Sequence, residues 1–160
     1  MRTKELVSLL PGVHLRELQR LLGTSYNTTR HHVEMLTRDG ELVCQKETHY
    51  TRLYPTQVRD KEKTAYSITR NKTTRIILEL IAANPRLTAK EIARNAGLAK
   101  STVSEHLHIL LQAHLVASTS TEGRMVYEAQ DADLVRRLIA LNRARLMEVA
   151  TDRFLDLWSF

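Results

Sequence analysis

The stretch from Leu87 to Val116 has the clearest pattern of apolar and polar positions in the chain. Thr88 and Glu91 have the spacing of a capping box, in which each side chain satisfies a free backbone N–H at a helix start. Gly97 can adopt the left-handed backbone conformation that ends a helix and reverses the chain. A second helix then carries apolar residues three and four positions apart, on one face of the helix: Val103, Leu107, Leu110 and Leu111. The pattern predicts a helix, a tight turn and a second helix.

The opposite face of this second helix is polar. It carries more varied hydrogen-bonding groups than a solvent-facing helix needs, namely Lys100, Ser101, Ser104, Glu105 and His108. The stretch resembles the helix-turn-helix of winged-helix transcription regulators, the broad ArsR/MarR-like group. The resemblance rests on the order Thr88-x-x-Glu91-Ile92-Ala93, Gly97-Leu98, Ser101-Thr102-Val103-Ser104-x-His106-Leu107, then Leu110 and Leu115-Val116.

The chain departs from this pattern at two positions. Ala99 stands where such proteins usually have a capping Ser, and His114 stands where they usually have Gly. We therefore expect a weaker cap on the second helix and a slightly different turn into the wing.

The first half of the chain repeats the second. A shift of 74 residues places Glu17 on Glu91 and Gly23 on Gly97, and no gap is needed from Val13 to Leu42. Residues of the same kind also coincide in the pairs Val13 and Leu87, Leu18 and Ile92, Thr28 and Thr102, His32 and His106, Val33 and Leu107, Leu36 and Leu110, and Leu42 and Val116. We therefore predict a second winged helix, and the run PGVHLRELQRLLG…HYTRLYP resembles the N-terminal module of tandem winged-helix regulators.

In this first module, helices are predicted over 4–10, 15–22 and 26–38. Thr24 or Ser25 is expected to cap the third helix. Two strands over 41–45 and 50–54 form the wing. The residues expected to face inward from the second helix are Leu15, Leu18, Leu21 and Leu22.

In the second half, a helix over 72–83 precedes the helix-turn-helix, and a wing follows over 117–128 with its turn at Glu122-Gly123. The connector between the modules has no firm periodicity. Asp131 or Asp133 would cap a long last helix that runs from Leu134 to about Leu157.

The apolar residues of this last helix lie on two faces, so more than one side should be buried. One stripe holds Leu134, Leu138 and Leu141, and the other holds Ile139, Leu146, Ala150 and Leu157. The helix either packs only on its own module or docks a second chain. Since ArsR/MarR-like proteins commonly dimerise through terminal helices, the resemblance favours a homodimer.

The predicted fold class is therefore α+β, mostly α, with two winged helix-turn-helix modules and a long C-terminal helix. The expected boundaries are 1–57 for the N-terminal winged helix, 58–71 for a basic connector, 72–130 for the second winged helix and 131–160 for the dimerisation helix. The apolar content of 42% and the charged content of 26% fit a soluble globular protein. A single cysteine excludes an internal disulfide and favours a cytoplasmic protein.

The net charge of +6 is concentrated near the connector. Residues 58–76 hold six Lys or Arg against two Asp or Glu, which is two thirds of the excess. This segment is either a solvated connector or a strap that lies near DNA phosphates.

The resemblance implies that the second helix of each motif enters the DNA major groove. Asn27 and Arg30 are the best candidates for base contacts in the first module, because Asn and Arg can contact adenine and guanine edges bidentately. Lys100, Ser101 and Ser104 are expected to contact phosphates. The full set of candidate DNA-binding residues is Tyr26, Asn27, Thr28, Arg30, His31, Lys46, Arg52, Lys100, Ser101, Thr102, Ser104, His108 and Arg124.

Other chemistries find little support in the sequence. His31 and His32 are adjacent and point about 100° apart on a helix, and His32 and His106 should half-face the core. We expect no metal site and no cofactor, because zinc sites normally need three or four ligands. No phosphate loop, nucleophile elbow or HExxH motif is present, so we expect no enzyme activity.

The sequence therefore predicts a sequence-specific regulator of transcription that binds double-stranded DNA. The alternative is a winged-helix adaptor that binds proteins in transcription or replication machinery. A membrane partner is not expected. A small-molecule effector is neither supported nor excluded.

Overall fold

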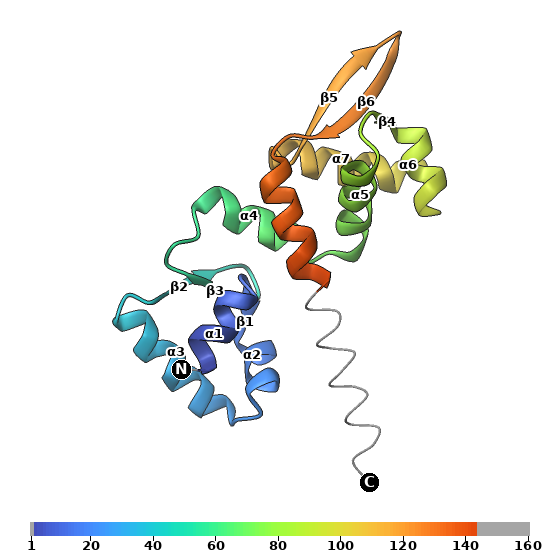
Figure 1. The fold of residues 1–160 in the computed structure, drawn as a ribbon. Coiled ribbons are helices and arrows are strands. Elements are labelled where there is room, and N and C mark those ends of the chain that lie inside the picture. The colour runs from blue at the N-terminus through green and yellow to red at the C-terminus, as the bar shows by residue number, and fades with distance from the viewer. Residues whose placement is uncertain (1, 144–160) are drawn as a thin grey trace. The chain divides into compact units, whose positions relative to one another are not determined.

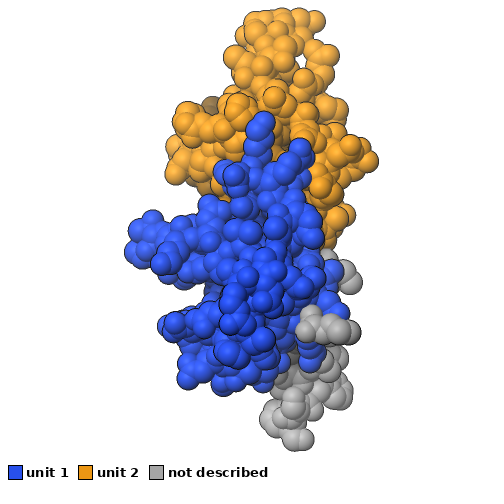
Figure 2. All heavy atoms as spheres, turned by 90° about the vertical axis from the view of Figure 1, so that its left-hand side faces the viewer, with its two compact units in different colours: residues 1–66 blue, residues 67–160 orange. Residues whose placement is uncertain are grey.

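The computed structural model describes residues 2–143 of the 160-residue chain. The chain divides into two compact units, Met1–Tyr66 and Ser67–Phe160, which Figure 2 distinguishes by colour. Each unit contains helices and one three-stranded antiparallel sheet (Figure 1). None of the described helices has the length and hydropathy of a membrane-spanning segment.

The first unit is a winged helix. Its elements are α1 (Arg2–Leu9), β1 (Val13–His14), α2 (Leu15–Leu22), α3 (Tyr26–Arg38), β2 (Leu42–Lys46) and β3 (Thr51–Pro55). The predicted bounds of α2 and α3 are confirmed, and the two wing strands begin and end one residue later than predicted. The sequence analysis did not predict β1, which pairs with β3 and completes a sheet of order β1-β3-β2.

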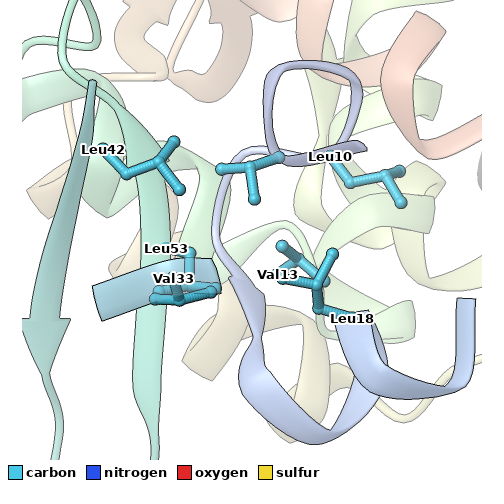
Figure 3. Packing of buried hydrophobic residues seen from close by; sticks show 7 residues of the cluster. Leu10, Val13, Leu18, Val33, Leu42 and Leu53 are labelled. Carbon is cyan, nitrogen blue, oxygen red and sulfur yellow. The ribbon is translucent and has the colours of Figure 1, made fainter. Parts of the chain in front are cut away.

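The core of this unit gathers apolar residues from every one of these elements (Figure 3). Leu18 of α2 is fully buried, and Leu15, Leu21 and Leu22 are partly buried against the same cluster, as predicted. The fully or nearly fully buried members are Val7, Leu10, Val13, Leu18, Val33, Leu42 and Leu53. Burial of apolar side chains on one face of each helix leaves the other face of α3 in solvent.

The connector contains a helix that the sequence analysis did not predict. This helix, α4 (Asp60–Ile68), begins with two acidic residues in its first turn, as suits the positive end of a helix dipole. Tyr54 Oη donates a hydrogen bond to the backbone oxygen of Lys63 at 3.3 Å, so the start of α4 is joined to β3. The boundary between the two units lies near its end.

The second unit repeats the order of the first. Its elements are α5 (Lys72–Ala83), β4 (Leu87–Thr88), α6 (Ala89–Ala96), α7 (Lys100–Gln112), β5 (Val116–Thr121) and β6 (Arg124–Ala129). The predicted bounds of α5 are confirmed. The wing strands each extend one residue beyond the predicted wing, and β4, like β1, was not predicted from the sequence. The sheet order is β4-β6-β5.

The 74-residue shift holds in the backbone as well as in the sequence. Leu42 pairs with Pro55 in the first sheet, and Val116 pairs with Ala129 in the second. Three residues with positive φ in each unit also coincide, since Gly12, Gly23 and Gly40 correspond to Arg86, Gly97 and His114. The φ angle of His114 is 55°, so the turn that replaces the usual glycine keeps a left-handed conformation.

The C-terminal helix is described over 132–143. Asp131 Oδ1 accepts a hydrogen bond from the backbone N–H of Leu134 at 3.0 Å, so the first of the two predicted capping residues is the one used. Leu134, Val135 and Leu138 are buried, whereas Ile139 on the second predicted stripe is partly buried. Leu146, Ala150 and Leu157 lie outside the described residues.

Candidate nucleic-acid interface

The helix α3 has one face in solvent, and this face carries the predicted residues of the first module. Val33 and Thr29 are buried and anchor the helix to its unit. Thr29 shares a hydrogen bond with Thr24 at 2.8 Å between their Oγ1 atoms, and this bond fastens the turn that leads into the helix. The exposed residues are Tyr26, Asn27, Thr28, Arg30 and His31.

Two charged side chains on this face form an ion pair with each other. Arg30 Nε donates a hydrogen bond to Glu34 Oε1 at 2.7 Å, and both side chains remain more than half exposed, at 62% and 58%. The hydrogen bond to Glu34 and the charge of that carboxylate raise the pKa of Arg30 above its ordinary value. The arginine is therefore positively charged and held along the helix face. Glu34 was not among the predicted residues, although its spacing of four from Arg30 could have identified it.

The corresponding helix of the second module, α7, is arranged in the same way. Val103, Leu107 and Leu110 are buried, as predicted. Lys100, Ser101, Ser104 and His108 are exposed, and Thr102 is partly buried. The exposed face therefore presents a lysine and two hydroxyls in place of the asparagine and arginine of α3.

The two helices differ at their N-termini. Ser25 caps α3, since its Oγ accepts a hydrogen bond from the backbone N–H of Thr28 at 3.1 Å. Ala99 occupies the same place before α7 and makes no side-chain cap, as the sequence predicted. The first turn of α7 therefore keeps backbone N–H groups that no side chain satisfies.

The helices that precede them are capped by different chemistry. The predicted capping box of α6 is present, with Thr88 and Glu91 each bonded to the backbone of the other. The backbone N–H and the Oγ1 of Thr88 both donate to Glu91 Oε2, at 2.8 and 2.9 Å, and hold the pKa of Glu91 below its ordinary value. In the first module His14 takes the equivalent place, and its Nδ1 accepts from the backbone N–H of Glu17 at 3.2 Å. The 74-residue shift from Thr88 is the signal that could have identified this cap.

The first wing is held by contacts within its own unit. Arg52 Nε donates to Glu47 Oε2 at 2.7 Å and its Nη1 donates to the backbone oxygen of Gly12 at 3.2 Å. The side chain of Arg52 is only 14% exposed, so this predicted DNA-binding residue fixes the wing instead of projecting from it. Tyr50, near the tip, stacks on His14 with ring centroids 5.3 Å apart, while Lys46 is exposed.

The second wing is longer and extends past the helices of its unit (Figure 1). Arg124 lies beside its turn and is exposed, as is most of the Ser and Thr run on β5. Arg86 Nη2 donates to Thr121 Oγ1 at 3.1 Å, so the residue before β4 is linked to the last residue of β5. Lys46 and Arg124 are thus the two predicted wing cations with an open side chain.

The equivalent histidines of the two modules differ in burial, which the repeat did not predict. His106 is partly buried and its Nδ1 shares a hydrogen bond with Thr74 Oγ1 at 2.8 Å, which agrees with a packed histidine. His32, at the equivalent position, is exposed, so the expectation that it half-faces the core is wrong. The reason is that α5 brings Thr74, in its first turn, beside His106, whereas the described part of α1 supplies no such partner to His32.

Some of the charged side chains of the connector form ion pairs with one another. Lys63 Nζ lies 2.8 Å from Asp60 Oδ1, and this ammonium holds the pKa of Asp60 below its ordinary value. The same Nζ lies 5.9 Å from the centre of the Tyr54 ring, and the Lys63 side chain is only 13% exposed. Lys61 and Lys72 are exposed, so the predicted strap retains cations for a phosphate partner.

Within residues 2–143, no group of three or more His, Cys, Asp or Glu residues is arranged to hold a metal ion. Cys44 is exposed on β2, and its Sγ lies 3.3 Å from Thr37 Oγ1.

Two protein-family profiles match the chain, one in each unit. Residues 70–116 match a family described as winged helix-turn-helix DNA-binding, and residues 1–66 match a family described as an N-terminal HTH domain. No curated protein matches the chain closely.

Three solved structures that match part of the chain are bacterial proteins. One is the homodimeric winged helix-turn-helix DNA-binding domain of a possible ArsR-family regulator from Mycobacterium bovis, 23% identical over 63% of this chain and 87% of that chain, with a TM-score of 0.45. Another is an ArsR-like transcriptional regulator from a Rhodococcus species, 21% identical over 61% and 88%, with a TM-score of 0.44. A third is the multiple antibiotic-resistance repressor from Listeria monocytogenes, 14% identical over 57% and 67%, with a TM-score of 0.42.

Each unit thus combines a matched helix-turn-helix with a β-hairpin wing and an open polar helix. The chain is a DNA-binding protein with two helix-turn-helix modules in tandem, the second of which matches a winged helix-turn-helix DNA-binding family.

Proposed function

We propose that this transcription regulator binds specific double-stranded DNA sequences, with α3 and α7 as its two recognition helices. The observation that carries the proposal is that both helices bury one apolar face and leave a polar face open at equivalent positions. The B-DNA major groove admits one α-helix, and the second helix of a helix-turn-helix lies in it. Two such helices in one chain can bind two stretches of groove.

The two helices are suited to different kinds of contact. Asn27 and Arg30 on α3 can contact base edges bidentately, each pair being worth about 1–3 kcal/mol of discrimination. Lys100, Ser101 and Ser104 on α7 suit phosphate oxygens, which fix position without reading sequence. The N–H groups left without a side-chain cap at the start of α7 favour an anion there as well.

The wings and the connector add further cations. Lys46 and Arg124 are exposed near the wing turns, and Lys61 and Lys72 are exposed in the predicted strap. These side chains suit phosphate oxygens, which supply most of the sequence-independent affinity for DNA.

The direct test is a fluorescence-anisotropy titration of the full chain against duplexes selected from a random DNA pool. We expect enrichment of a defined sequence and a log K that falls linearly with log[salt], because each neutralised phosphate releases counterions. An affinity that depends on neither salt nor sequence would exclude the proposal. The single cysteine and the DNA target are consistent with action in the cytoplasm.

We also propose that the chain acts as a homodimer joined by its C-terminal helix. Leu134, Val135 and Leu138 are already buried within the chain, so a second apolar stripe beginning at the partly buried Ile139 is the part suited to a partner. A dimer of such chains binds a longer palindromic site, with half-sites about 34 Å apart. Sedimentation equilibrium of the full chain should give twice the 18.4 kDa monomer mass, and a monomer at micromolar concentration would contradict this part.

A further inference from the structure

The strongest unassigned feature is the ion pair between Arg30 and Glu34 on the open face of α3. A carboxylate is an unfavourable group on a surface that approaches DNA phosphates, because like charges repel. Glu34 nevertheless lies one turn after Arg30, on the row of positions that also carries Tyr26. Phosphate binding therefore does not explain why Glu34 stands on this face.

The geometry of the pair indicates that Glu34 orients the side chain of Arg30. The hydrogen bond to Glu34 uses the Nε of Arg30. Within the part of the chain that the structure describes, the two Nη groups of Arg30 make no hydrogen bond, and the side chain is 62% exposed. Glu34 thus fixes the guanidinium plane and leaves its outer edge free. Two parallel N–H donors on that edge match O6 and N7 of guanine in the major groove.

The same geometry disfavours a phosphate contact by Arg30. A phosphate bound to the Nη edge would bring its negative charge close to the Glu34 carboxylate. The guanine edge carries two neutral acceptors, so it meets the arginine without this repulsion. The pair is therefore better suited to contact base edges in the groove than to contact the phosphate backbone.

The second module has no equivalent pair. The positions that correspond to Arg30 and Glu34 under the 74-residue shift are Ser104 and His108, and both are exposed. A hydroxyl and an imidazole do not form a fixed bidentate donor. The arginine-acid pair is therefore specific to the first module rather than a feature of the repeated fold.

We propose that Arg30 reads one guanine in the half-site of the first module and that Glu34 is a positioning residue that holds its guanidinium for this contact. This inference rests on the proposed function, because it requires that α3 enters the major groove. It adds to that function a base identity and a residue that contacts no base.

The test uses the full chain and its selected DNA site. Affinities are measured by anisotropy for the site and for every single base-pair substitution within it, with the native chain, R30A and E34A. The matched control is R38A, which removes the same charge from the same helix, at an arginine that lies 3.9 Å from Asp39 near the C-terminal end. Circular dichroism and thermal unfolding of each variant show whether the fold is kept.

The native chain should prefer guanine at one position by about tenfold, within the range of a bidentate contact. R30A should lose this preference and keep its affinity at the other positions, whereas R38A should retain the preference. E34A should reduce the preference several-fold and at the same time raise affinity for unrelated sequences, because a negative charge is removed from the surface. A purely structural role of Glu34 would not produce these two opposite changes.

The outcomes separate this inference from the proposed function. If R30A lowers affinity equally for all sequences and reduces the salt slope by about one, Arg30 binds a phosphate and the inference is wrong while the function stands. If E34A leaves the guanine preference unchanged, Glu34 is not a positioning residue. If the native chain shows neither salt-dependent nor sequence-dependent binding, the proposed function itself fails.

Discussion

The two modules have the same backbone and different surfaces. The two helices of each helix-turn-helix, the strand register and three left-handed positions coincide under one shift of 74 residues, even where Gly12 and Gly40 are replaced by Arg86 and His114. A left-handed conformation costs a non-glycine residue about 1–2 kcal/mol, so the surrounding packing must enforce these turns. The fold is therefore fixed by buried apolar positions, while the exposed residues are free to differ.

The exposed residues differ where a partner would be bound. On α3, Asn27 and the Arg30–Glu34 pair suit base edges, and on α7, Ser101, Ser104 and Lys100 suit phosphates. We therefore propose that the first module supplies sequence discrimination and that the second supplies position and affinity. Substitutions in the two modules can test this comparison directly.

The largest effect is expected in the cores. Leu18 and Ile92 occupy equivalent places and both are fully buried. L18A and I92A should each destabilise their own module by about 2–5 kcal/mol, because the deletion removes buried methyl groups and leaves a cavity. Amide hydrogen exchange resolved by residue should show faster exchange in the module that carries the substitution. Equal acceleration in both modules would mean that the two units unfold as one.

The next effect concerns DNA and compares Asn27 with its equivalent Ser101. N27A should relax the preference at one base pair by about 1–3 kcal/mol, whereas S101A should weaken binding to all sequences alike. Anisotropy titrations against the selected site and its single-base variants measure both quantities. The division of roles is wrong if S101A changes selectivity more than N27A does.

A smaller effect is expected at the helix caps. S25A should cost the first module about 1 kcal/mol, because the hydrogen bond from the Thr28 N–H loses its acceptor. A99S should stabilise the second module by a similar amount, since it supplies the cap that is missing there. Denaturant unfolding of both variants gives the two free energies. Changes of the same sign would show that capping does not distinguish the modules.

The smallest effect is the pH dependence that the capping box of α6 gives to the second module. The bonds from Thr88 hold the pKa of Glu91 below its unfolded value, so the ionised carboxylate stabilises the folded state. This contribution is present above the unfolded pKa of the carboxyl and is lost as the pH falls through its lower folded pKa. Unfolding of native protein and E91Q should therefore differ at neutral pH and converge in acid. A difference that persists unchanged in acid would exclude this linkage.

Much of this fold follows from local pattern alone. The bounds of α2, α3 and α5 were predicted because apolar spacing, caps and glycine turns all agree there. The strands β1 and β4 were not, because two-residue strands have no periodicity and form only by pairing with β3 and β6. The helix α4 was missed for a related reason, since its exposed Lys61 and buried Glu62 and Ala65 do not form a clear apolar stripe.

The candidate site was predicted less completely than the fold. Exposure of Asn27 and Ser101 follows from helical phase, because the buried positions fix which residues face solvent. The burial of Arg52 does not follow from phase, because its bonds to Glu47 and Gly12 depend on how the wing packs on its unit. The contact between His106 and Thr74 likewise joins residues 32 positions apart that only the tertiary fold brings together.

The proposed function requires that both α3 and α7 face DNA. The most direct measurement is a residue-resolved nuclear magnetic resonance titration of the full chain with its selected duplex. The largest amide shifts are expected at the exposed starts of the two helices, over 26–31 and 100–105, with smaller shifts at Lys46 and Arg124. Saturating DNA that leaves either helix unshifted would contradict the claim.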